Sequence, residues 1–188
     1  MSEYQGTFKR YEKKYLVTQQ QYNALAKVFA ARMVPDRFAE STISNIYYDT
    51  PDFRLIRRSL DRPAYKEKLR LRTYRTPGAD TEAFVEIKKK YDHIVYKRRI
   101  AMTYSEAQAY LDGGAAPEQS QISNEIDWFL HFYKGIQPAM CICYDRLALF
   151  DKYQPELRVT FDSGIRWRMD DLDLSSGSAG EQLLPHDT

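Results

Sequence analysis

The chain has 188 residues, of which 43% are hydrophobic and 14% aromatic, which is enough for one domain with a sizeable core. This composition excludes a disordered, collagen-like or disulfide-scaffold protein, and no apolar run approaches the roughly 18 residues of a membrane span. The formal net charge is only +2, yet residues 1–100 carry 22 Lys and Arg against 12 Asp and Glu, and residues 101–188 carry 6 against 14. Balances of +10 and −8 predict a polyanionic partner for the first half.

The first part of the chain predicts a strand, a helix and a second strand. Residues 8–17 are rich in aromatic and β-branched types, which favours a strand. Thr18 and Gln21 form a capping box ahead of an amphipathic helix over 19–31. The next strand is expected over 43–49.

A hairpin-rich segment follows. Asp52 is the expected cap of a short helix over 52–59. Turn residues at 76–80 and at Asp92-His93 separate three further strands, expected over 64–75, 82–89 and 94–103.

The second half predicts two helices and more strands. Ser105 caps one helix, which ends at Asp112, and Ser123 begins another with a clear apolar face. The expected strands are 139–150, 156–162 and 164–169. We predict one α+β domain over 1–170, with helices outside an antiparallel sheet, and a polar loop or tail over 171–188.

Cysteine usage indicates a reducing compartment. Cys141 and Cys143 are the only cysteines and stand two residues apart, so a disulfide framework is excluded and a cytoplasmic protein is expected. Both share the parity of Leu147 and Leu149, which predicts small core residues.

The strand over 66–74 carries a stripe of positive charge. Alternate side chains point to opposite faces, so four consecutive positions on one face are basic, namely Lys66, Lys68, Arg70 and Arg72. Their spacing of about 6.6–6.8 Å suits the successive phosphates of a chain. A solvated sheet face is the alternative interpretation.

Other strands show the same division into an apolar and a charged face. Register leaves open whether Lys97 with Arg99 or Tyr96 with Arg98 points inward. If the sheet closes on itself, the charged faces line a lumen. Buried cations there need water, carboxylates or a polyanion, which predicts a tunnel for a linear phosphate chain.

Seven segments in order resemble the VTC-type polyphosphate polymerase domain of the triphosphate tunnel metalloenzymes. They are residues 10–15 (RYEKKY), 46–53 (IYYDTPDF), 66–74 (KEKLRLRTY), 84–88 (FVEIK), 96–99 (YKRR), 144–146 (YDR) and 157–162 (LRVTFD). The resemblance implies an α+β fold with an antiparallel β-barrel of the triphosphate tunnel, CYTH-like type and helices outside. It implies transfer of the γ-phosphate of ATP to inorganic polyphosphate, with Mn²⁺ or Mg²⁺.

The resemblance also implies roles for individual residues. Tyr144 is the expected nucleotide contact, and Glu12 and Glu86 are the candidate metal ligands, although both carboxylates could instead neutralise neighbouring cations. The expected catalytic residues are Arg70, Arg72, Lys88, Arg146 and Arg158. The expected phosphate-binding residues are these five together with Lys14, Arg62, Lys68 and Lys97.

Two departures from the family pattern affect these expectations. The hydrolase and cyclase branch opens with Glu-x-Glu-x-Lys, whereas this chain has Arg10-x-Glu12-x-Lys14, which favours the polymerase branch and removes one metal ligand. The family's final metal-binding strand and helix are expected beyond Thr188.

Three other functions compete with polyphosphate synthesis. A hydrolase of inorganic triphosphate or nucleoside triphosphates would use the same tunnel with water as acceptor. A non-catalytic module would bind polyphosphate only. RNA binding on an open basic sheet, with Tyr74 stacking on a base, is the least favoured, and the sequence does not indicate an oligomeric state.

Overall fold

The computed structural model describes residues 7–10, 12–92 and 94–185, so His93, one of the two residues of the expected turn, lies outside the described residues. The elements in chain order are β1 (Thr7–Arg10), α1 (Gln19–Ala30), β2 (Met33–Asp49), α2 (Arg54–Leu60), β3 (Tyr65–Tyr74), β4 (Glu82–Tyr91), β5 (Ile94–Thr103), α3 (Tyr104–Leu111), α4 (Gln121–Phe132), β6 (Gln137–Asp151), β7 (Arg158–Arg168), the 3-10 turn η1 (Leu174–Ser176) and β8 (Glu181–Gln182). Among the described residues, no helix combines the length and apolar character needed to cross a membrane.

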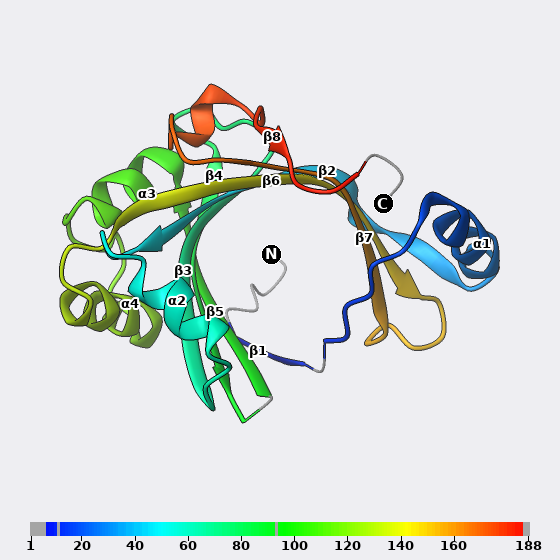
Figure 1. The fold of residues 1–188 in the computed structure, drawn as a ribbon, viewed down its shortest axis with the longest axis horizontal. Helices are drawn as coiled ribbons and strands as arrows, with labels where there is room; N and C mark the ends of the chain where they lie inside the picture. The colour runs from blue at the N-terminus through cyan, green and yellow to red at the C-terminus, as the bar shows by residue number, and fades with distance from the viewer. Residues whose placement is uncertain (1–6, 11, 93, 186–188) are drawn as a thin grey trace.

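The sheet has eight strands in the order β1-β5-β4-β3-β2-β6-β7-β8, and each neighbouring pair is antiparallel. It curls strongly, with α1, α3 and α4 on its convex side (Figure 1). Residues 12–18 cross from the end of β1 towards α1 and β7 (Figure 1). The predicted α+β tunnel-like fold is therefore confirmed, although within the described part of the chain hydrogen bonds do not close the sheet into a complete barrel.

The hydrophobic core lies between the convex face of the sheet and α3 and α4. Ile46, Leu69, Leu71, Val85 and Ile87 occupy alternate strand positions and are at most 2% exposed. They pack with Tyr110, Ile126 and Phe129 from the two helices. Successive side chains of a strand point to opposite faces of the sheet. Because the apolar side chains fill the convex face, the charged side chains between them lie on the concave face.

Several expected boundaries were wrong. The first strand was predicted over 8–17, but β1 ends at Arg10 and residues 12–18 have no regular structure. Pro35 was expected to precede the second strand, yet β2 begins at Met33 and accommodates Pro35 beside a register irregularity between Pro35 and Glu40. That position fits the rule that proline is tolerated at bulges.

Three helix caps also differ from expectation. Thr103 rather than Ser105 caps α3 in a capping box with Glu106, and Ser120 rather than Ser123 caps α4. At α2, the carboxylate of Asp49 rather than Asp52 accepts from the backbone N–H groups of Leu55 and Ile56. Thr103 and Ser120 lie a few residues before the predicted caps. At α2 the N-cap residue is Phe53, which makes no side-chain cap hydrogen bond, so Asp49 binds the first turn from outside the helix.

The C-terminal segment, for which a polar loop or tail is expected over 171–188, has little regular structure in its described part and packs against the sheet. Leu174 is fully buried in the core, and β8 pairs with β7 at Arg166 and Trp167. Arg168 donates to the backbone carbonyls of Asp171, Asp173, Gly177 and Ala179. These hydrogen bonds, rather than a long apolar run, hold the segment against the sheet. The sequence pattern alone therefore does not show that the segment is ordered.

Candidate functional site

A buried carboxylate stands at the centre of four cationic side chains on the concave face. Glu86 of β4 is 1% exposed. Its Oε2 lies 2.6 Å from Arg70 Nη2 and 3.8 Å from Arg72 Nε, and its Oε1 lies 2.6 Å from Lys97 Nζ and 3.9 Å from Arg99 Nη1. We call these five residues the Glu86 cluster.

Sheet register explains why these groups meet. Arg70 of β3 and Arg99 of β5 stand directly opposite Glu86 on its two neighbouring strands. Directly opposite side chains in an antiparallel sheet lie on the same face, with Cβ atoms about 4.5–5.5 Å apart. One step along the strands, Lys68 stands opposite Lys88, and Lys88 opposite Lys97, so three lysines form a row.

The structure resolves the ambiguity in β5. Lys97 and Arg99 point to the Glu86 cluster, whereas Arg98 pairs with Glu125 of α4. Arg99 was left out of the expected site. The signal that could have found it is the turn at 92–93, which fixes the register between β4 and β5.

Polar side chains of β2 and β6 hold the two arginines of β3. Tyr47 Oη accepts from Arg70 Nη1 at 3.1 Å, and Asn45 Oδ1 accepts from Arg72 Nε at 2.9 Å. Arg72 Nη2 donates to Tyr144 Oη at 3.1 Å. Sequence reasoning missed Asn45 as a site residue, although asparagine is depleted in strands and is therefore an uncommon choice inside β2.

A second cluster forms around Glu12, which lies in the segment of residues 12–18 between β1 and α1 (Figure 1). Glu12 lies 3.2 Å from Lys88 Nζ and 3.7 Å from Lys14 Nζ. Lys88 and Lys14 lower the pKa of Glu12 against the opposing effect of burial, and Arg146 contributes to the same shift. The expected residues Lys14, Lys88 and Arg146 therefore share one electrostatic environment.

Burial and charge shift the pKa values of the Glu86 cluster. Burial would raise the pKa of Glu86, but Arg70, Arg72 and Lys97 outweigh it and lower that pKa to about 2. Burial lowers the pKa of Lys97 to about 8, despite the attraction of Glu86. Burial also lowers the pKa of Lys68, with Lys66, Lys88 and Lys14 adding to the shift, as expected where like charges crowd together.

Three further expected phosphate-binding residues lie outside both the Glu86 cluster and the two lysine-rich groups described above. Arg146 makes two hydrogen bonds to the carboxylate of Asp162, of 2.6 and 2.7 Å, and its guanidinium lies over the Tyr144 ring. Arg158 pairs with Asp36 at the start of β7. Arg62 lies exposed in the turn after α2 with a φ of 52°.

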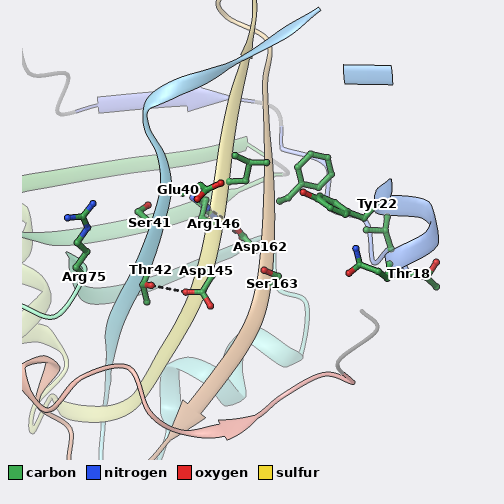
Figure 2. A pocket seen from close by; sticks show the side chains of 14 residues that line it. Thr18, Tyr22, Glu40, Ser41, Thr42, Arg75, Asp145, Arg146, Asp162 and Ser163 are labelled. Atoms are coloured by element: carbon green, nitrogen blue, oxygen red, sulfur yellow. Dashed lines mark hydrogen bonds and ion pairs between the residues drawn. The ribbon is translucent and has the colours of Figure 1, made fainter. Parts of the chain in front are cut away.

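A hollow of about 620 Å³ lies beside β7, between the start of α1 and strands β2, β6 and β7 (Figure 2). Tyr22 and Phe161 form an edge-to-face pair there, and Thr42 Oγ1 donates to Asp145 at 2.7 Å. Arg146 and Asp162 also contribute to its lining. Three carboxylates and two guanidinium groups line this hollow, so it suits a condensed phosphate less well than the Glu86 cluster does.

The carboxylates do not fit the divalent ion that the resemblance implies. Within the described parts of the chain, no three His, Cys, Asp or Glu residues come together as a metal-binding group. Glu86 already faces four cations, and Glu12 faces two. A dication beside either carboxylate would be repelled by those cations.

Comparisons with known proteins agree with this architecture. No curated protein matches the sequence. The crystal structure described as a "putative adenylate cyclase" from Bacillus halodurans superposes with a TM-score of 0.53 and 14% identity, over 85% of this chain and 82% of that one. A Vibrio parahaemolyticus structure with the same description covers 85% of this chain and 70% of its own, with 15% identity and a TM-score of 0.43.

At this identity the first structure supports the fold alone. The sequence model of the VTC domain matches residues 9–186, which is nearly the whole chain. The chain therefore belongs to the VTC domain family, within the triphosphate tunnel metalloenzyme superfamily.

Proposed function

We propose that the chain binds ATP and linear polyphosphate on its concave face and transfers the γ-phosphate of ATP to the end of the polyphosphate. Members of the superfamily are typically phosphoryl-transfer enzymes that use divalent metal ions. The single observation that carries the proposal is the Glu86 cluster, in which three adjacent strands bring four cations around one carboxylate.

Lys68 and Lys88 stand in one row with Lys97 and extend the cationic surface beyond the Glu86 cluster. A surface of this length matches a linear chain of phosphates better than a single phosphate. Arginine presents a planar fork that can hold two phosphate oxygens, whereas lysine presents a point charge that tolerates a sliding ligand. This division supports a fixed triphosphate at the arginines and a longer chain along the lysines.

Phosphoryl transfer needs alignment and stabilisation of charge more than covalent chemistry. In the proposed reaction, a terminal oxygen of the polyphosphate forms a bond to the γ-phosphorus as the bond to the bridging oxygen of ATP breaks. ADP leaves with the electron pair, and the chain gains one phosphate. Arg70 and Arg72 hold phosphoryl oxygens, while Lys88 and Arg146 align the second phosphate chain.

Product analysis tests the proposal. The full chain is incubated with ATP and Mn²⁺ or Mg²⁺, and products are separated by gel electrophoresis and ³¹P NMR. Polymer with internal phosphate resonances is expected. Orthophosphate alone would instead identify a triphosphatase, and binding without turnover would identify a polyphosphate-binding module.

Substitutions test the site itself. Arg70→Ala and Arg72→Ala are expected to lower tripolyphosphate affinity at least tenfold, because each removes a charge-assisted contact, while circular dichroism remains native. Arg57→Ala is the matched control, since Arg57 forms an exposed ion pair with Asp52 on α2. Unchanged affinity in both Arg70 and Arg72 variants would overturn the site assignment.

A further inference from the structure

The two carboxylates with the best position to hold a metal ion are already neutralised by the protein. Both oxygens of Glu86 have a cation at 2.6 Å, namely Arg70 on one side and Lys97 on the other. Glu12 has Lys88 at 3.2 Å on one oxygen and Lys14 at 3.7 Å on the other. Each carboxylate therefore acts as an anion within a cationic surface.

A divalent ion requires a different set of neighbours. Mg²⁺ prefers about six oxygen ligands, and Mn²⁺ favours the same carboxylate and water oxygens. Glu86 offers one carboxylate, and in the described structure four cationic groups lie within 4 Å of it. Position 10, where the hydrolase and cyclase branch of the resemblance has a glutamate, is an arginine here.

The cations themselves supply the counter-charge for a condensed phosphate. The central concave positions of β3, β4 and β5 bear Lys68, Arg70, Arg72, Lys88, Lys97 and Arg99 against the one carboxylate of Glu86. The resulting excess of five positive charges is comparable to the negative charge of a triphosphate. A metal ion is therefore not needed to neutralise the bound chain.

We propose that this face binds condensed phosphate without a divalent ion held by Glu12 or Glu86, and that Glu86 is an internal counter-anion. In the absence of phosphate, Glu86 holds Arg70, Arg72, Lys97 and Arg99 in place. When phosphate binds, it competes with Glu86 for the same four groups. This inference rests on the proposed function, because it assumes that condensed phosphate binds here.

Calorimetric titration of the full chain with inorganic tripolyphosphate, in EDTA and in Mn²⁺, tests the inference. The affinity in EDTA is expected to equal or exceed that in Mn²⁺, because free metal reduces the charge of the ligand. Binding that requires Mn²⁺ would overturn the inference and leave the site intact. Absence of binding in both conditions would refute the proposed function itself.

Charge-removing variants provide an independent measurement. Glu86→Gln is expected to raise tripolyphosphate affinity in EDTA severalfold, since the counter-anion competes with phosphate for the four cations. Glu12→Gln is expected to act in the same direction and keeps the test valid if the buried variant fails to fold. Glu118→Gln removes one negative charge from an exposed loop and serves as the control.

The two roles of a carboxylate give opposite results in this experiment. A metal ligand would lose affinity in Mn²⁺ by tenfold or more when changed to glutamine, with no change in EDTA. That result for Glu12→Gln, or for a folded Glu86→Gln, would overturn the proposal.

Discussion

The side chain of Lys97 carries a pH-sensitive charge, and its Nζ lies 2.6 Å from Oε1 of the buried Glu86 carboxylate. Burial lowers the pKa of Lys97 to about 8. The amine is therefore mostly protonated at pH 7, and most of its positive charge is lost at pH 9. Tripolyphosphate affinity is expected to fall by roughly tenfold over this interval, the value of one charge-assisted hydrogen bond. Titrations at several pH values measure it, with Lys97→Arg as the variant that should abolish the dependence. Parallel pH profiles for the two proteins would contradict this role.

Individual side chains could be predicted from the sequence where strand parity alone decides their face. Arg70 and Arg72 followed from the alternation in β3, and Cys141 and Cys143 are 1% exposed as that alternation in β6 predicts. Strand parity alone does not favour Arg99 over Arg98, because a shift of one residue in register exchanges the two faces. The ion pair between Glu12 and Lys88 joins residues far apart in sequence, which no local pattern reveals.

Residues 171–179 lie beside the two buried thiols, since Leu174 belongs to the same core cluster as Cys141 and Cys143. Arg168 stands opposite Cys141 in the β6–β7 pairing and donates to four backbone carbonyls of residues 171–179. Arg168→Ala is expected to release this segment and accelerate modification of Cys141 and Cys143 by a thiol reagent at least tenfold. Arg158→Ala, at the other end of β7, should leave that rate unchanged. Equal rates in both variants would show that residues 171–179 do not protect the thiols.

Elements were predictable in order more than in number or extent. The strands expected over 156–162 and 164–169 form the single strand β7. The capping box of Thr18 and Gln21 marks the start of α1 as expected. The first residues of the long strand β2 were not predicted, because a proline such as Pro35 ordinarily interrupts a strand. The short β8 has only two residues, and its pairing with β7 depends on tertiary contacts rather than on β propensity.

Across the whole molecule, the positive half of the sequence forms one continuous side of the sheet. Strands β1 to β5 contain most of the charge excess of residues 1–100 and are adjacent in the order β1-β5-β4-β3-β2. Bringing these cations together creates repulsion in the unliganded protein. Burial lowers the pKa of Lys68, and the neighbouring Lys66, Lys88 and Lys14 lower it further. Function and stability are therefore opposed on this face.

This opposition predicts the effect of removing one lysine. Lys68→Ala is expected to raise the melting temperature of the unliganded protein at about 0.01 M salt, and the gain should shrink near 0.1 M salt as the Debye length falls to about 10 Å. The same change should weaken tripolyphosphate binding. Lys89→Ala is the control, since Lys89 pairs with Glu125 on the convex side. Scanning calorimetry at both salt concentrations decides the matter, and a salt-independent change in Lys68→Ala would argue against repulsion.

The excess charge on the concave face has a practical consequence for handling the protein. A surface that concentrates cations will retain sulfate, citrate and cellular polyanions through chromatography. These bound anions would then occupy the same lysine and arginine side chains that a later titration is meant to probe. Washing with concentrated chloride and exchange into a buffer of monovalent anions should precede every affinity measurement. Without that step, a strong binder would register as a weak one.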